Sequence, residues 1–234
     1  MKSKHILAIG AHPGDMEISC GAVLAAHRAN GNKVTIVHLT NGVENDSHLT
    51  NNNSFRRIKI EAEDAASVID TNVIFGPYQS NKLKEDEEST QFITNLICNI
   101  HPTSVITHWK NSIQPDHKIT HKIVYNSLLS NKPQKITSNL LPYNGVEELY
   151  FTENWEDRED FEPFIYIDVT KYMDVWLKMV SCYEQFKTGS TSTSSYIKNY
   201  QELSRIRGTE SNFSYACTFN LSRTIKKQFI DILP

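Results

Sequence analysis

The order of apolar runs along the first 130 residues constrains the fold more than any other feature of the sequence. Short apolar or β-branched runs alternate with stretches that repeat apolar residues at helical spacing. Such alternation is typical of an open, mostly parallel sheet flanked by helices. The expected strands are residues 5–10, 33–39, 72–75 and 104–109, and the expected helices are residues 17–30, 55–70, 91–100 and 116–129.

The second half of the chain has a different pattern. Strands are predicted at residues 149–152 and 164–169, and helices at residues 175–186 and 197–206. We therefore expect a single α/β domain over residues 1–234. In it, residues 131–234 form a smaller C-terminal β/α portion that packs on a core of residues 1–130 and completes the site.

Charge and cysteine content exclude several classes of protein. The net charge of -3 gives no overall field that favours nucleic acid or an anionic membrane surface. The four cysteines are dispersed and predict no disulfide framework. The first apolar run is too short for the core of a signal peptide, and no later run could span a membrane. We therefore expect a cytoplasmic protein without nucleic-acid or membrane partners.

Polar residues with metal-binding chemistry follow several of the predicted strands. His12 and Asp15 follow the first strand, and His117 follows the fourth. Because ligands bind beyond the carboxyl ends of parallel strands, these side chains are expected at one edge of the sheet. Two imidazoles and one carboxylate form a ligand set of catalytic zinc, which leaves a fourth position for water. Asp116 could support a ligand from behind, or it could simply cap the next helix.

Four segments of the sequence together resemble the PIG-L/LmbE-like zinc-dependent N-deacetylases. Residues 11–22, AHPGDMEISCGA, resemble the first signature of that family, A-H-P-D-D-E. Residues 108–121, HWKNSIQPDHKITH, resemble its second signature, H-P-D-H followed by a further His. Residues 183–190, YEQFKTGS, also fit the family, and residues 207–219, RGTESNFSYACTF, resemble its closing segment.

The resemblance implies a Rossmann-like fold, one zinc ion and hydrolysis of N-acetyl groups, commonly on N-acetylglucosamine conjugates. It implies His12, Asp15 and His117 as the zinc ligands and aligns Asp116 with the carboxylate of the second signature. It also implies a homo-oligomer, a trimer or a hexamer.

Two catalytic positions depart from the family pattern. Gly14 stands where the family has the aspartate that acts as general base, and Gln114 stands where it has a histidine that assists the transition state. Gly14 cannot accept a proton, and losing a positioned base costs about 10²–10⁴-fold in rate. Gln114 can still donate a hydrogen bond to an oxyanion. Asp116 and His121 are the favoured substitutes for the base, ahead of His108 and Glu44.

These features favour a zinc-dependent hydrolase that removes an N-acetyl or other acyl group from an amide, with a sugar conjugate as its small-molecule substrate. The alternative is a non-catalytic or weakly active relative that binds a metal or a sugar. A nucleotide-binding domain is disfavoured because the first turn lacks G-x-G-x-x-G. Some aromatic residues could wall a sugar site or belong to the core: Trp109, Tyr143, Tyr150 and Trp155.

Overall fold

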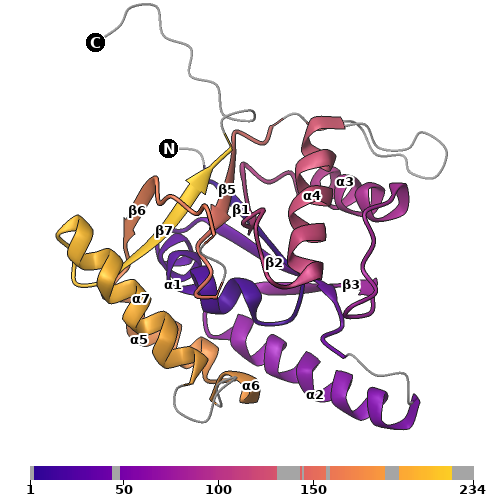
Figure 1. Cartoon of the computed structure of the whole chain (residues 1–234), viewed down its shortest axis with the longest axis horizontal. Helices are drawn as coiled ribbons and strands as arrows, with labels where there is room; N and C mark the ends of the chain where they lie inside the picture. The colour runs from indigo at the N-terminus through magenta and orange to yellow at the C-terminus, as the bar shows by residue number, and fades with distance from the viewer. Residues whose placement is uncertain are drawn as a thin grey trace, which may run out of the picture.

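A computed structural model describes residues 3–43, 48–130, 143, 145–156, 159–187 and 195–222, without the side chains of residues 48–53 and 130. Its strands form one seven-stranded sheet with helices on both faces (Figure 1). The strands are β1 (His5–Gly10), β2 (Lys33–Thr40), β3 (Asn72–Tyr78), β4 (Ser104–His108), β5 (Glu148–Thr152), β6 (Ile165–Asp168) and β7 (Ala216–Leu221). The α-helices are α1 (Asp15–Ala29), α2 (His48–Ser67), α3 (Glu87–Ile100), α4 (Pro115–Ser130), α5 (Met173–Val180), α6 (Glu184–Lys187) and α7 (Tyr196–Ser211); a short 3-10 helix, η1 (Thr170–Tyr172), precedes α5.

The sheet is mostly parallel, as the sequence predicts. Its strand order is β3-β2-β1-β4-β5-β7-β6. The first five strands in that order run parallel to their neighbours, whereas β7 pairs antiparallel with both β5 and β6. Strands from both halves of the chain thus share one sheet.

Two apolar cores lie on opposite faces of the sheet, because successive strand residues point to opposite sides. Along β1, Ile6 and Ala8 belong to one core, together with residues of α1, α2, α5 and α7. Leu7 and Ile9 belong to the other, together with residues of α3 and α4. Both faces of β1 are therefore covered, which explains its continuous apolar run.

The strand order creates a switch point between β1 and β4. From β1 the chain proceeds to β2 and β3, and it then returns across the sheet to β4 on the other side of β1. In open α/β sheets, ligands bind in the crevice at such a point, beyond the carboxyl ends of the strands. The residues that follow β1 and β4 consequently face a shared crevice.

Several predicted element boundaries were wrong. Helix α2 begins at His48, seven residues before the start at residue 55 that the sequence predicts, because Asn and Ser are weak helix formers and the prediction excluded them. The helix predicted over residues 175–186 is divided into α5 and α6. The chain turns between these two helices and directs Tyr183 inward, where its side chain is fully buried.

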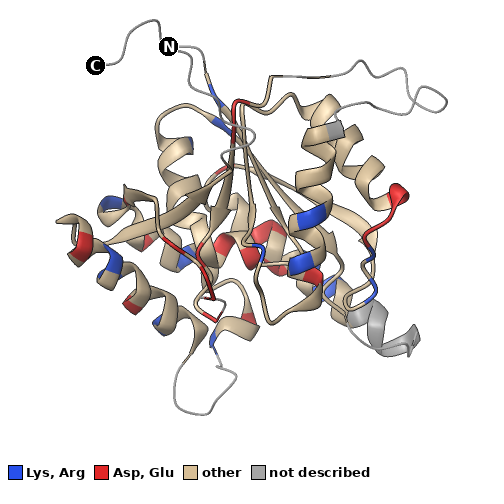
Figure 2. Cartoon of the chain, turned by 45° about the horizontal axis from the view of Figure 1, so that its top comes forward, with Lys and Arg blue, Asp and Glu red and all other residues tan. Residues whose placement is uncertain are grey.

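Charged residues of both signs are distributed along the described part of the chain. Lys and Arg occur in short, separate stretches on many elements, and Asp and Glu lie among them (Figure 2). Each described helix is too short or too polar to cross a lipid bilayer.

Candidate metal centre

A tight turn after β1 positions His12 and Asp15. The backbone N–H of Asp15 donates to the carbonyl oxygen of His12 (3.2 Å), which closes the turn just before α1 begins. Gly14 lies between them at φ 97° and ψ -16°, a left-handed conformation that glycine adopts without steric cost. The turn is compact enough to direct both side chains into the crevice.

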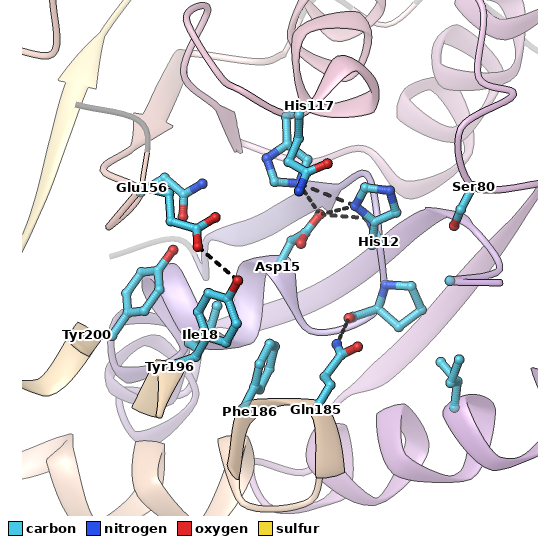
Figure 3. Close-up of a pocket in the computed structure, with 15 residues that line it drawn as sticks. His12, Asp15, Ile18, Ser80, His117, Glu156, Gln185, Phe186, Tyr196 and Tyr200 are labelled. Carbon is cyan, nitrogen blue, oxygen red and sulfur yellow. Dashed lines mark hydrogen bonds and ion pairs between the residues drawn. The ribbon is translucent and has the colours of Figure 1, made fainter. Parts of the chain in front are cut away.

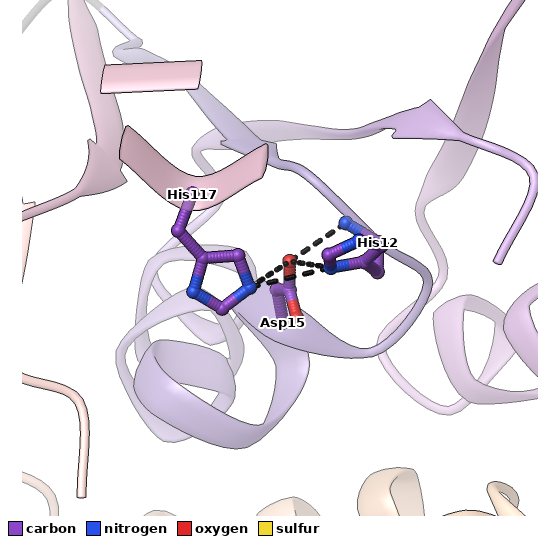
Figure 4. Close-up of side chains that lie close together, drawn as sticks. All are labelled: His12, Asp15 and His117. Atoms are coloured by element: carbon purple, nitrogen blue, oxygen red, sulfur yellow. Dashed lines mark hydrogen bonds and ion pairs between the residues drawn. The ribbon is translucent and has the colours of Figure 1, made fainter. Parts of the chain in front are cut away.

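His117 reaches the same crevice from the first turn of α4. That helix follows β4, which pairs directly with β1, so the two turns lie next to each other. Pro115 at its first position is compatible with a helix start, where no intrahelical N–H bond is needed. Figure 4 shows the His117 ring pointing toward Asp15 and His12.

The three side chains have the spacing that a shared metal ion requires. Nδ1 of His12 lies 3.3 Å from Nε2 of His117. Oδ2 of Asp15 lies 3.5 Å from the same His12 nitrogen and 3.3 Å from the same His117 nitrogen. Tetrahedral zinc with bonds of about 2.0–2.1 Å places its ligand atoms roughly 3.3 Å apart. The donor set and its geometry therefore fit a zinc ion.

Each imidazole has a partner on the ring nitrogen that faces away from this cluster. Nε2 of His12 lies 3.1 Å from Oδ2 of Asp116, which also accepts the backbone N–H of Asn81 (2.7 Å). Nδ1 of His117 lies 3.3 Å from Oγ of Ser112. Such outer partners fix the orientation of the ring and the position of its proton. They leave one nitrogen of each ring directed at the shared point.

His108 supports the cluster from the end of β4. Its Nε2 lies 3.1 Å from Oδ2 of Asp15, and its ring stacks on His117 at 3.9 Å between centroids. The backbone N–H of Ala11 donates to the same Nε2 (3.0 Å). Burial above all, and then the charge of His117, lower the pKa of His108 to about 4. His108 is therefore neutral at pH 7 and accepts the bond from Ala11.

Without a metal ion, the two carboxylates hold a proton on His12. Burial alone lowers its pKa, but hydrogen bonds to Asp116 and Asp15 outweigh burial and raise the pKa to about 10. Burial raises the pKa of Asp15, yet the charge of His117 and hydrogen bonds from His117 and His12 hold it well below its usual range. Asp15 is thus an anion beside a protonated imidazole, and a metal cation can take the place of the proton on His12.

The cluster lies at one side of an open cavity of about 230 Å³ (Figure 3). Segments from both halves of the chain line the cavity. The N-terminal half contributes His12, Pro13, Asp15, Ile18, Gly42, Ile58, Ser80, Gln114 and His117. The C-terminal half contributes Asn154, Glu156, Gln185, Phe186, Tyr196 and Tyr200. The C-terminal portion therefore completes the cavity.

Helix α6 fills the space in front of Gly14. A Cβ atom added to Gly14 would lie 2.5 Å from Cζ of Phe186, far closer than atoms normally approach. The same Cβ would lie 3.5 Å from Nε2 of Gln185, which donates to the carbonyl oxygen of Pro13 (3.1 Å). An aromatic ring and an amide therefore occupy the direction in which a side chain at position 14 would project.

The three residues expected to assist catalysis occupy different places. Gln114 lines the cavity, whereas Asp116 lies behind His12. His121 is absent from the cavity lining: its Nδ1 lies 2.9 Å from the carbonyl oxygen of His108, and its ring packs on Phe151. Glu44 lies outside the described residues.

The aromatic residues that line the cavity are not those that the sequence offered as candidates for a sugar site. Phe186, Tyr196 and Tyr200 line the cavity, and none of the four aromatics named from the sequence does. Trp109, for example, packs edge-on against Phe151 and is buried in the core. Glu156 is a further lining residue that sequence reasoning missed. Its place in the string E-N-W-E-D of residues 153–157 predicts no role by itself.

Comparison with solved structures shows the same fold in several proteins. The chain matches the 4-carboxy-2-hydroxymuconate hydratase GalB of Pseudomonas putida KT2440 with a TM-score of 0.82 and 16% identity, over 99% of this chain and 100% of that one. It matches the N,N′-diacetylchitobiose deacetylase of Pyrococcus horikoshii with a TM-score of 0.81 and 18% identity, over 94% and 84% of the two chains. It matches the conserved protein TT1542 of Thermus thermophilus with a TM-score of 0.78 and 20% identity, over 98% of each.

The family is shown by a sequence model rather than by these structures. Residues 7–128, more than half of the chain, match the model described as PIG-L, GlcNAc-PI de-N-acetylase. The match contains both turns that carry His12, Asp15 and His117. The family and the deacetylases among the similar structures support a hydrolase of the deacetylase type. The chain belongs to the PIG-L family.

Proposed function

We propose that this chain is a zinc-dependent hydrolase that removes an N-acetyl or other acyl group from an amide, on a substrate of the N-acetylglucosamine-conjugate type. One observation carries the proposal. His12, Asp15 and His117 each offer a ligand atom that lies within 4.8 Å of the other two, at the side of an open cavity. Membership of the PIG-L family supports the choice of reaction.

A bound zinc ion would polarise the acyl carbonyl and lower the pKa of an attacking water. The residues of the chain orient the metal ligands and donate hydrogen bonds to the reacting group. Asp116 keeps the proton of His12 on Nε2, so that Nδ1 stays available as a ligand. The side-chain amide of Gln114, at the wall of the cavity, can donate a hydrogen bond to the oxyanion that develops from the carbonyl.

The reaction is expected to be slow because neither of the described side chains in front of Gly14 can accept a proton. Gln185 and Phe186 occupy that space, and an amide can orient a water molecule but cannot take its proton. The absence of a positioned base costs about 10²–10⁴-fold in rate. Asp116 could act as the general base only indirectly, by accepting a proton from His12, because its Oδ2 faces Nε2 of the His12 ring.

Purified protein should be tested for metal content and for acetate release from N-acetylglucosamine conjugates. We expect about one zinc per chain, loss of turnover with a chelator, and recovery when zinc is restored. His117→Ala should lose both metal and activity. His101→Asn, at an exposed helix end with left-handed backbone that Asn tolerates, is the matched control. A metal-free parent, or an active His117→Ala variant, would contradict the proposal.

The occupied space in front of Gly14 also favours a second candidate, a metal- or sugar-binding relative with little or no activity. Under this candidate the parent binds zinc but releases no acetate. Restoring the family residues requires Gly14→Asp and Gln114→His together with Phe186→Ala, because Phe186 would otherwise collide with the new carboxylate. Activity in this triple variant alone would favour the second candidate, whereas turnover by the parent at a rate comparable with that of the triple variant would exclude it.

We also propose that the protein is cytoplasmic, as expected from the sequence, and, on the resemblance alone, that it forms a trimer or a hexamer. Light scattering on the eluted protein would measure the oligomeric state, and a monomer would contradict that part.

A further inference from the structure

Glu156 places a carboxylate in the cavity away from the metal cluster. It belongs to the segment that follows β5, and it lines the same cavity as His12 and His117. In the view of Figure 3, Glu156 and His12 lie on opposite sides of Asp15. A ligand that reaches from the metal cluster to Glu156 would bring to this carboxylate the part that extends away from its scissile group.

Two contacts to the same helix hold the Glu156 segment in place. The hydroxyl of Tyr196, the first residue of α7, donates to Oε1 of Glu156 (2.8 Å). Three residues earlier, Glu153 is buried and accepts a hydrogen bond from Nε of Arg207, also on α7 (2.8 Å). Glu156 is thus fixed by surrounding structure, so a ligand meets it in a defined position.

The cavity is negatively charged at the end that Glu156 lines. Its lining, within the described part of the chain, includes two carboxylates, Asp15 and Glu156, and neither Lys nor Arg. Asp15 is surrounded by histidines and faces the metal point. The Glu156 carboxylate has a hydrogen bond from a neutral hydroxyl and no ion pair with any described Lys or Arg. A carboxylate offers about four acceptor positions, so several stay available for donors from a ligand.

Tyr196 contacts this carboxylate through its hydroxyl, and the ring of Tyr200 lines the same cavity (Figure 3). An aromatic face attracts a cation, and a carboxylate pairs with it, so the combination favours an ammonium group. A carboxylate or phosphate on the ligand would instead meet like charge.

We propose that Glu156 is a specificity-determining residue that selects amides carrying a protonated amine on the part of the substrate that extends away from the scissile acyl group, such as amino sugars with one acetylated and one free amine. This inference rests on the proposed hydrolase function.

The test compares three substrates at pH 7: N-monoacetylchitobiose, which carries a free amine, neutral N,N′-diacetylchitobiose and anionic N-acetylglucosamine 6-phosphate. In the zinc-loaded parent, kcat/KM should be highest for the first and lowest for the third. Glu156→Gln keeps the shape and removes the charge, so the preference for the amine should fall about tenfold. Added salt should weaken the preference in the parent.

Two control variants separate charge from structure. Glu156→Asp retains the carboxylate and should retain the order of the three substrates. Glu202→Gln removes an exposed carboxylate from α7 that does not line the cavity, and it should leave all three rates unchanged. Urea unfolding of each variant shows whether the fold is intact. An unchanged preference in a folded Glu156→Gln variant, or a preference for the phosphate, would overturn the inference.

A binding measurement distinguishes failure of this inference from failure of the proposed function. Calorimetry with glucosamine, glucose and glucuronate on the zinc-loaded protein needs no turnover. If no amide is hydrolysed, but glucosamine binds best and does so only with Glu156 present, the hydrolase proposal fails and the ligand preference stands. If amides are hydrolysed without any charge preference, the hydrolase stands and the role of Glu156 is rejected.

Discussion

Oδ2 of Asp116 lies 3.1 Å from Nε2 of His12, the ring nitrogen that does not face His117. Asp116 is only 2% exposed, and it also accepts the backbone N–H of Asn81. The carboxylate therefore holds the imidazole in one orientation, with Nδ1 directed at the point shared with Asp15 and His117. Asp116 therefore contacts a ligand, His12, and is not itself one of the three ligands.

Removal of Asp116 should weaken metal binding without abolishing it. Asp116→Ala leaves all three ligands but releases the His12 ring, and loss of such an outer partner typically costs about 10–100-fold in metal affinity. Competition with a chromogenic chelator measures this change. Asp70→Asn removes a carboxylate that is 98% exposed, and it should bind zinc like the parent. Equal affinity in Asp116→Ala and the parent would contradict the assigned role.

Substitution of Gly14 should destabilise the protein more than a comparable glycine elsewhere. Gly14 and Gly31 both have positive φ, 97° and 76°, so Ala at either position costs about 1–2 kcal/mol in backbone strain. A Cβ at Gly31 meets nothing within 4 Å, whereas at Gly14 it collides with Phe186. Overpacking adds about 1–3 kcal/mol to the Gly14 variant alone.

Urea denaturation of Gly14→Ala and Gly31→Ala measures this difference in the free energy of unfolding. The double variant Gly14→Ala/Phe186→Ala should lose less free energy of unfolding than the sum of the two single variants, because it lacks the collision. Equal destabilisation by the two single variants would show that Phe186 does not fill the space.

Zinc binding should tighten with rising pH. Hydrogen bonds to Asp116 and Asp15 raise the pKa of His12 to about 10 in the metal-free protein, so His12 must lose a proton to act as a ligand. The apparent affinity should therefore rise by about tenfold per pH unit between roughly pH 7 and 9 for this proton alone. Calorimetry in buffers of different ionisation enthalpy counts the released protons. An affinity independent of pH in this range would contradict the protonation of His12.

The same pKa predicts how the metal-free protein responds to alkali. A folded pKa above the value of 6.5 in the unfolded chain means that the contribution of His12 to stability is fully present below about pH 6.5. It is lost as pH rises through about 10. The Tm of the metal-free protein should fall over this interval relative to a His12→Ala variant, which lacks the proton.

Loss of Arg207 should destabilise the C-terminal portion. Arg207 pairs with buried Glu153, and removal of one partner of a buried pair costs about 3–5 kcal/mol because the other charge is left without compensation. Arg207→Gln should therefore lower the free energy of unfolding by several kcal/mol. Arg57→Gln removes an arginine whose side chain is 67% exposed, and it should change stability little. Similar effects of the two variants would show that the buried pair is dispensable.

The parallel core could be predicted from the sequence because its signal is local. Each strand such as β1 is a short apolar run, and each helix such as α1 repeats apolar residues at helical spacing. The rule that ligands bind beyond the carboxyl ends of parallel strands then predicted that residues after β1 and β4 meet. That the predicted ligands His12, Asp15 and His117 lie within 4.8 Å of one another agrees with this expectation, while the presence of zinc stays a prediction.

The far side of the cavity could not be predicted because its signal is not local. Glu156 follows β5, Phe186 lies in α6 and Tyr196 begins α7, and no local pattern in these segments predicts that they meet the residues after β1. For His121, local spacing predicted a place at the site that the structure does not show. It stands one helical turn after His117, but the ring turns toward Phe151 instead of the cavity.

The central claim is that His12, Asp15 and His117 share one metal ion. The most direct test is anomalous diffraction at the zinc edge from crystals grown with zinc. We predict one strong peak about 2.0–2.2 Å from Nδ1 of His12, Nε2 of His117 and a carboxylate oxygen of Asp15. A zinc-loaded crystal with no peak at this point, or with the ion held by other residues, would contradict the account.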